Sequence, residues 1–236
     1  MSSGHAPFRF RQFTVHHDRC AMKVGTDGVL LGAWADLPIA GAGLDIGTGS
    51  GLLALMAAQR SPGLVLDAVE PDPAAAAQAR DNIQASPWRD RIEIWETRIQ
   101  AFTPPRAYEV ILCNPPFFRQ ALAAPDPVRH LARHADDLPY EALIETLVRL
   151  LMPQGTASMI IPVSEGPHLL RLTAAAGLKM IRQTVVRTTP AKAPYRWLLT
   201  LSREDIPLAT DELVLHEPGS NRYSAAHQAL TGAFYL

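Results

Sequence analysis

The stretch LDIGTGSG, residues 44–51, decides the fold. A short apolar run ends in glycines at positions 47, 49 and 51, and the segment 52–60, LLALMAAQR, follows with apolar residues at helical spacing. This pattern predicts a buried strand that turns tightly into a helix. Glycines at such a turn let the backbone approach a ligand closely, and the N-terminus of the helix faces that ligand.

A strand–helix alternation continues from this turn to residue 203. Further strands are predicted at 65–70, 91–96, 108–114 and 156–162, helices from Pro73, over 138–151 and near 164–176, and an antiparallel pair at 179–187 and 195–203. Alternating elements of this kind imply a parallel sheet covered on both faces. The sequence therefore predicts an α/β fold: a Rossmann-like, doubly wound, mostly parallel seven-stranded sheet with a C-terminal antiparallel hairpin.

Composition bounds the class of protein. A chain of 236 residues that is 47% hydrophobic is expected to form one domain, residues 13–236, after a flexible N-terminal arm, residues 1–12, which lacks periodicity. The apolar windows are too short to cross a bilayer, so we expect a soluble, cytoplasmic monomer. Cys20 and Cys113 are far apart and form no CxxC motif, so neither a disulfide nor a zinc cluster is expected.

Three candidate ligand-binding features follow predicted strands. They are the glycine turn, Glu70 and Asn114, and because the carboxyl ends of parallel strands meet at one edge of a sheet, we expect them on one rim. A glycine-rich turn can serve NAD, FAD, S-adenosylmethionine or close packing alone, but an acid about 20 residues later is typical of a nucleoside cofactor. A carboxylate at Asp45 would repel a pyrophosphate and attract a sulfonium or an ammonium. The residues therefore favour S-adenosylmethionine.

The stretch ILCNPPFFR, residues 111–119, carries the predicted chemistry. Two prolines hold the backbone of Asn114, Pro115 and Pro116 nearly rigid at the end of a strand. If the side-chain oxygen of Asn114 and the carbonyl of Pro115 accept hydrogen bonds from an NH2 group, they favour a pyramidal nitrogen that can attack a methyl group. Phe117 offers a face on which a planar base can stack. The alternative is that this stretch is only a turn followed by a piece of core.

These motifs resemble the class I S-adenosylmethionine-dependent methyltransferases of the NPP(Y/F) type. More narrowly, they resemble the bacterial tRNA (adenine-N6)-methyltransferases that modify the adenine 3′ of the anticodon in a valine tRNA. The segments that carry this resemblance cover most of the chain: 8–34, 44–60, 67–72, 86–92, 113–118 and 223–236.

The resemblance implies roles for individual residues. Contacts to the cofactor are expected from Asp45, Gly47, Gly49 and Glu70, contacts to its methionine end from Thr26 and Asp27, and contacts to the target amine from residues 114–117. The family usually has an acid after the third strand, and here that cofactor-binding position holds Arg98. A guanidinium is a donor only and cannot accept a hydrogen bond from the adenine amine of the cofactor.

The expected activity is tRNA adenine-N6 methylation in the anticodon loop. Two alternatives are a glutamine N5-methyltransferase acting on a release factor, because a carboxamide suits the same Asn-Pro-Pro geometry, and a non-catalytic module that binds cofactor and RNA. Arg9, Arg11 and Lys23 are candidate RNA contacts, although the aromatics of FRFRQF (8–13) could instead dock on the core.

Two further groups of charged residues need interpretation. Segment 165–203 carries seven basic residues and one acid, which suits either a patch that faces phosphates or a solvated sheet edge. His130 and His134 lack the Glu of a zinc-protease motif, so no metal is expected.

Overall fold

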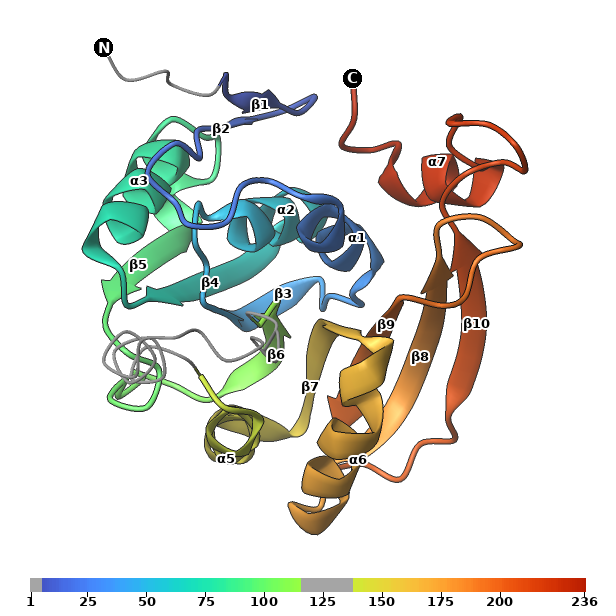
Figure 1. Cartoon of the computed structure of the whole chain (residues 1–236). Coiled ribbons are helices and arrows are strands. Elements are labelled where there is room, and N and C mark those ends of the chain that lie inside the picture. The colour runs from blue at the N-terminus through green and yellow to red at the C-terminus, as the bar shows by residue number, and fades with distance from the viewer. Residues whose placement is uncertain (1–5, 116–137) are drawn as a thin grey trace, which may run out of the picture.

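The computed structural model describes residues 6–115 and 138–236 and arranges them around one eight-stranded sheet (Figure 1). The strands of this sheet are β3 (Ala40–Ile46), β4 (Gly63–Glu70), β5 (Ile92–Glu96), β6 (Tyr108–Cys113), β7 (Leu151–Pro162), β8 (Lys179–Arg187), β9 (Arg196–Ser202) and β10 (Ala209–Val214). Their order is β10-β8-β9-β7-β6-β3-β4-β5. All neighbours run parallel except β9, which is antiparallel to β7 and β8. The Rossmann-like α/β fold and the antiparallel β8–β9 pair are therefore confirmed.

Helices cover both faces of the sheet. One face packs against α1 (Thr26–Trp34), α2 (Leu52–Arg60) and α3 (Pro73–Gln84), and the other against α5 (Tyr140–Leu150) and α6 (Gly166–Ala175), as Figure 1 shows. Each face has its own apolar core. Leu64 and Leu66 of β4 point to the first core, whereas Leu44 and Ile46 of β3 point to the second. Burial on both faces explains why these strands read as continuous apolar runs.

The predicted count of seven strands is wrong, because β10 adds an eighth at the edge. Four of its six residues are exposed, and Asp211 and Glu212 interrupt the apolar pattern that marks a buried strand. Their charges are accommodated at this edge: Glu212 pairs with Arg187 of β8 at 3.0 Å, and Asp211 accepts a hydrogen bond from Thr184.

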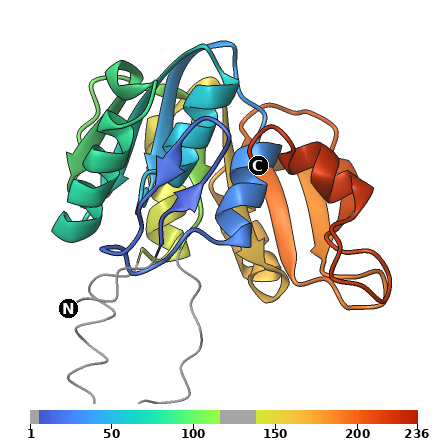
Figure 2. The same ribbon diagram turned by 90° about the horizontal axis from the view of Figure 1, so that it is seen from above.

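The described part of the expected N-terminal arm is packed against the domain. Strand β1 (Phe8–Arg9) pairs with β2 (Thr14–Val15), and Phe10 between them is only 4% exposed. The backbone N–H of Arg11 donates to the carbonyl of Phe234 at 2.9 Å, so the β1–β2 hairpin lies beside the C-terminal residues (Figure 2). Phe8 and Phe10 of the expected arm therefore pack on the core, and the domain boundary at residue 12 stays a prediction.

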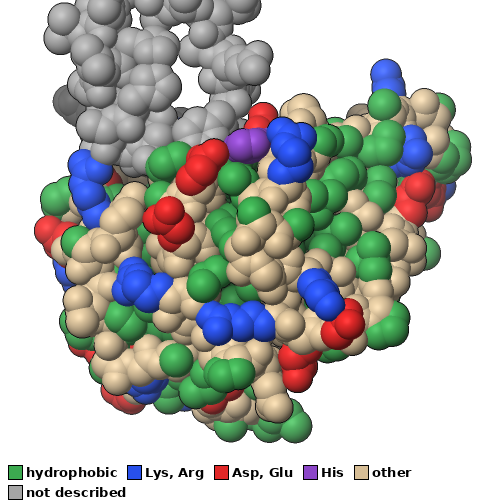
Figure 3. Space-filling model, turned by 90° about the horizontal axis from the view of Figure 1, so that it is seen from below, with side chains coloured by type: hydrophobic (Ala, Val, Ile, Leu, Met, Phe, Trp, Pro, Cys, Tyr) green, Lys and Arg blue, Asp and Glu red, His purple; other side chains and the backbone are tan. Residues whose placement is uncertain are grey.

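The basic segment 165–203 is largely neutralised by acids from other parts of the chain. Figure 3 shows basic and acidic side chains interspersed on the underside of the molecule as drawn in Figure 1. The structure favours a solvated sheet edge over a patch that faces phosphates. Four of the seven basic residues form ion pairs: Lys179 with Asp205, Arg182 with Asp36, Arg187 with Glu212, and Arg196 with Asp27.

The last helix, α7 (Ala225–Thr231), packs against α1 and β10. Ser224 caps it, since its hydroxyl accepts a hydrogen bond from the N–H of His227 at 3.0 Å. Among the helices of residues 6–115 and 138–236, none is long and apolar enough to cross a membrane.

Candidate active site

The carboxyl ends of β3, β4 and β6 meet at one rim, as the sequence predicts. Ile46 at the end of β3 is in register with Val69 of β4 on one side and with Cys113 of β6 on the other. Beyond the strands, the N–H of Gly47 donates to the carbonyl of Val69 at 2.9 Å. The glycine turn, Glu70 and Asn114 therefore lie on adjacent strand ends.

The glycine turn has a backbone that requires glycine. Gly47, Gly49 and Gly51 have φ angles of +70°, +55° and +83°, a region that other residues rarely adopt. A Cβ built on Gly47 or Gly49 would meet no atom within 4 Å, so the backbone is open to close approach by a ligand. A Cβ built on Gly51 would lie 3.6 Å from Cβ of Ala79 in α3.

Glu70 is fixed next to this turn. One carboxylate oxygen accepts a hydrogen bond from the N–H of Gly49 at 2.8 Å, and the other accepts from the N–H of Asp72 at 3.0 Å. The side chain is 8% exposed, and burial raises its pKa above the usual value. Each carboxylate oxygen has a second lone pair, so Glu70 can still accept hydrogen bonds from two hydroxyl groups.

Asp45 lies beneath the turn and is fully buried. Its Oδ2 accepts hydrogen bonds from the hydroxyl of Thr48 at 2.5 Å and from the N–H of Ala54 at 3.2 Å. Its Oδ1 is buried and has no hydrogen-bond partner among the described residues. Burial raises the pKa of Asp45 to about 7. An unpartnered buried carboxylate oxygen suits a cationic or hydrogen-donating ligand.

Asn114 follows β6 directly and turns its side chain inward. The Oδ1 atom is buried with no partner in the described part of the chain. Its Nδ2 lies 3.9 Å from the position of a Cβ on Gly28, which places the first turn of α1 beside it. Pro115 is buried, whereas Pro116 and Phe117 lie outside the described residues.

Asp27 and Thr26 occupy the first turn of α1. Asp27 accepts a hydrogen bond from Nε of Arg196 at 2.9 Å, and both side chains are only about one-fifth exposed, at 19% and 21%. This ion pair ties the start of α1 to β9. No sequence pattern points to Arg196 as a partner of Asp27, because the two residues lie 169 positions apart. Thr26 is exposed.

Arg98 lies in the segment that leaves β5, on the same rim. The N–H of the preceding Thr97 donates to the carbonyl of Glu70 at 3.2 Å, and Arg98 itself is exposed. Arg149 of α5 holds the segment in place by donating to the carbonyls of Ile99 and Phe102, at 3.1 Å and 3.0 Å. The slot expected to face the adenine of a cofactor is therefore at the rim, and the role of Arg98 in it stays a prediction.

The candidate RNA contacts lie to one side of the rim. Arg9 and Arg11 line a groove of about 740 Å³, together with aromatic side chains from the C-terminal segment. Gly25 and Thr26, at the start of α1, also line it, so the groove leads toward the rim. Lys23 is exposed in the loop that precedes α1.

Among residues 6–115 and 138–236, no group of three or more His, Cys, Asp or Glu side chains is arranged to hold a metal ion. His130 and His134 lie outside these ranges.

Comparison with known proteins identifies the family. Residues 24–147 match the family model described as "Methyltransferase small domain". A tRNA1(Val) (adenine(37)-N6)-methyltransferase of Tolumonas auensis is 47% identical over 99% of this chain and 98% of its own length. The protein of the same name from Phocaeicola vulgatus is 46% identical over 97% of each chain. The chain belongs to the family of tRNA1(Val) (adenine(37)-N6)-methyltransferases. The prediction of an S-adenosylmethionine-dependent N-methyltransferase is thereby confirmed.

Solved structures agree on the methyltransferase fold. A predicted O-methyltransferase from Agrobacterium tumefaciens has a TM-score of 0.67 at 21% identity, covering 88% of this chain and 96% of its own. The glycopeptide N-methyltransferase MtfA complexed with S-adenosylmethionine has a TM-score of 0.56 at 15% identity, covering 77% of this chain and all of its own. At these identities the likeness concerns the fold alone.

Proposed function

We propose that this member of the family transfers a methyl group from S-adenosylmethionine to the N6 amine of the adenine 3′ of the anticodon in a tRNA. Family membership supports the reaction class, and one observation carries the site: the buried, unpartnered Oδ1 of Asn114 at the rim. An amide oxygen there is an acceptor for an incoming amine. A tRNA substrate also places the reaction in the cytoplasm.

Residues on the strand ends and on α1 would hold the cofactor. Glu70 has acceptor capacity for the ribose hydroxyls, while Asp45 and Asp27 supply negative charge for the cationic methionine end. The open backbone at Gly47 and Gly49 allows close approach. Bound S-adenosylmethionine supplies a methyl group on a sulfonium, an electrophile that needs no metal.

Asn114 and Pro115 would activate the amine. The exocyclic nitrogen of adenine is a poor nucleophile because its lone pair is delocalised into the ring. Two fixed oxygen atoms that accept hydrogen bonds from its two N–H groups favour a pyramidal nitrogen whose lone pair is available for attack. The proline restricts Asn114 to extended geometry, so these acceptors are preorganised, and such preorganisation can lower a barrier by several kcal/mol. Phe117 keeps its proposed role as the stacking surface for the base.

The groove lined by Arg9, Arg11 and the C-terminal aromatic side chains is the proposed path of the RNA. Arg9 and Arg11 are the only charged side chains among its described lining residues, so it suits a polyanion. Tyr223 and Tyr235, which also line it, have nearly parallel rings at 10° and offer faces on which bases can stack. An anticodon-loop base is already unpaired, so presenting it costs less than flipping a base out of a duplex.

Labelled cofactor and defined substrates test the proposal. A transcript of a valine tRNA with adenine 3′ of the anticodon should yield N6-methyladenosine on digestion, whereas the same transcript with guanine there should take up no label. A release factor and a DNA duplex serve as the other arms. Label in the release factor, equal label in both transcripts, or no label in any arm would each contradict the proposed function.

A further inference from the structure

A loop fastened to α3 spans the rim between the glycine turn and α1. Residues 16–24 leave β2, and the N–H of Val24 donates to Nδ1 of His17 at 3.1 Å, which closes the loop on itself. The middle of the loop lies near Glu70, whose charge adds to burial in raising the pKa of Cys20 to about 11. The C-terminal end of the loop leads into α1, where a Cβ built on Gly28 would lie 3.9 Å from Nδ2 of Asn114.

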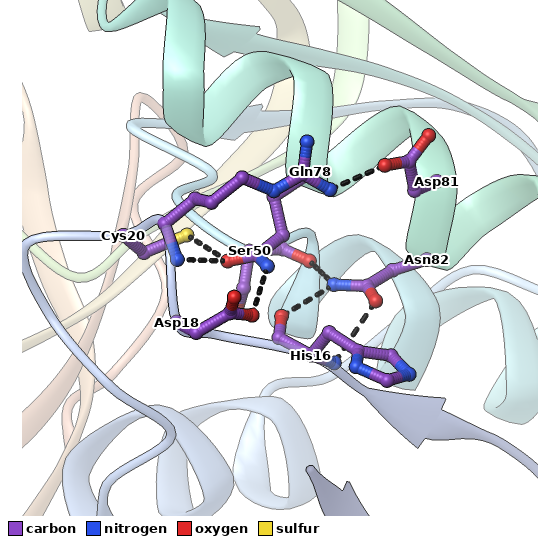
Figure 4. A network of polar contacts seen from close by, with 8 residues as sticks. His16, Asp18, Cys20, Ser50, Gln78, Asp81 and Asn82 are labelled. Atoms are coloured by element: carbon purple, nitrogen blue, oxygen red, sulfur yellow. Dashed lines mark hydrogen bonds and ion pairs between the residues drawn. The ribbon is translucent and has the colours of Figure 1, made fainter. Parts of the chain in front are cut away.

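Asn82 of α3 joins this loop to the glycine turn. Its Nδ2 donates to the carbonyls of His16 and Ser50, both at 2.8 Å, and its Oδ1 accepts from the N–H of His16 at 2.9 Å (Figure 4). The side chain is 2% exposed, so water has little access to replace these bonds. Ser50 lies between Gly49 and Gly51, which makes Asn82 a direct support of the turn.

Gln78, one helical turn earlier, binds the loop but not the turn. Its Oε1 accepts from the N–H of Arg19 at 2.9 Å and from the thiol of Cys20 at 3.2 Å, and its Nε2 donates to Asp18 at 2.6 Å. On the exposed side of the same helix, Asp81 forms an ion pair with Arg19. The helix therefore holds the loop at three points, and only Asn82 also reaches the glycine turn.

We infer that Asn82 is a positioning residue for cofactor binding: it holds the 16–24 loop and the glycine turn in one fixed arrangement around the cofactor. The inference rests on the proposed function, since it takes the rim as the cofactor site. Removing the Asn82 amide leaves the carbonyls of Ser50 and His16 without their donor. Either the turn or the loop then has to shift, and both flank the same site. Among residues 6–115 and 138–236, the side chain of Asn82 forms hydrogen bonds with His16 and Ser50 alone. Its loss therefore weakens the binding of cofactor and leaves the chemical step intact.

Kinetics of Asn82→Ala test this inference. We expect KM for S-adenosylmethionine to rise about tenfold or more, while kcat at saturating cofactor stays within about twofold. Asp81→Ala is the matched control: it removes an exposed ion pair to the same loop from the same helix, and KM should change by less than about twofold. Gln78→Ala should fall between the two. A folded Asn82→Ala protein with unchanged KM, or with kcat lowered at unchanged KM, overturns the inference.

A measurement on the wild-type protein decides the matter if Asn82→Ala does not fold. Hydrogen exchange of the His16 and Arg19 amides, which donate to Asn82 and Gln78, should slow by at least about tenfold when cofactor is added. Amides of β10, at the opposite edge of the sheet, serve as the internal control. If the wild-type enzyme methylates tRNA but cofactor does not slow hydrogen exchange of the loop amides, the inference about Asn82 is wrong and the proposed function stands. If cofactor slows exchange of these amides but tRNA is not methylated, the proposed function is wrong and the inference stands.

Discussion

Two buried oxygen atoms at the rim lack a partner in the described chain, Asp45 Oδ1 and Asn114 Oδ1. Leaving a buried acceptor unsatisfied costs roughly 1–3 kcal/mol, so such atoms are rare unless a ligand provides the missing donor. They lie on adjacent strands, at the ends of β3 and β6. Asp45 suits the cationic end of the cofactor, and Asn114 suits the amine that receives the methyl group.

Asp45 should release a proton when cofactor binds. Burial raises its pKa to about 7, so at about pH 6.5 more than half of the free protein carries the protonated form, whereas a bound cation favours the carboxylate. Calorimetry in two buffers of different ionisation enthalpy should show more than half a proton released per cofactor. Asp45→Asn should release none. Equal binding enthalpies in both buffers for the wild-type protein would rule out this role.

The same shift fixes the sign of the pH dependence of stability. Between about pH 4 and pH 7 the native state binds more protons at Asp45 than the unfolded state does. The contribution of this group to the free energy of unfolding of the cofactor-free protein therefore falls as pH rises through that range, and it is constant above it.

Sequence patterns located the residues whose positions depend only on strand ends. Asp45, Glu70 and Asn114 are at the rim because each sits at or next to the carboxyl end of a predicted strand. Their supporting partners could not be predicted. In the sequence, Asn82 is only one polar residue of a predicted helix, and Arg196 is only one residue of a basic segment. The fold brings Asn82 to Ser50 and Arg196 to Asp27.

At the scale of elements, the apolar periodicity predicted a helix or strand correctly where one face of the element is apolar and the other polar, or where the whole run is apolar. It failed at α1, because seven of its nine residues are buried and no polar face marks the helical period. It failed at β10 for the opposite reason, since an edge strand with four exposed residues carries no apolar run.

The packing of α6 on β9 should tolerate no side chain at Gly166. A Cβ there would lie 1.9 Å from a ring carbon of Trp197, and a rigid ring cannot yield as a flexible chain does. We expect Gly166→Ala to lower the free energy of unfolding by about 1–3 kcal/mol in urea titrations. Gly25→Ala, whose Cβ would meet the carbonyl of Lys23 at an ordinary 3.7 Å, should cost less than about 1 kcal/mol, which is the loss of glycine at the N-cap of α1 without a clash. Equal effects of the two substitutions would show that the contact is not tight.

At the scale of the whole molecule, residues 10–11 and 234–235 lie side by side next to the rim. Nε of Arg11 donates to the carbonyl of Tyr235, 224 positions later, and Phe10 stacks on the ring of the same tyrosine. The sequence FRFRQF alone left an RNA contact and a docked aromatic segment equally open. The structure shows the docked aromatic segment, because the Phe10 ring is buried. It leaves Arg9 exposed at the groove, and the contact of Arg9 with RNA stays a prediction.

Binding of RNA should depend on local rather than overall charge, because the net charge of the chain is −1. We expect Arg9→Ala to weaken tRNA binding and to reduce the slope of log K against log salt concentration by about 1. Lys179→Ala is the control that removes the same charge. Lys179 lies on β8, outside the groove, and already pairs with Asp205. An unchanged slope in Arg9→Ala would show that Arg9 contacts no phosphate and that the RNA does not follow this groove.

Asn114 should act as a hydrogen-bond acceptor for the target amine, and single-turnover methylation of tRNA by Asn114 variants is the sharpest test of this role. With cofactor and tRNA saturating, Asn114→Ala should slow methyl transfer by about 10²–10³-fold while the dissociation constants of both ligands change by less than about threefold. Asn114→Asp, which keeps an acceptor oxygen at the same position, should retain more activity than Asn114→Ala. Transfer at the wild-type rate in Asn114→Ala would contradict the account.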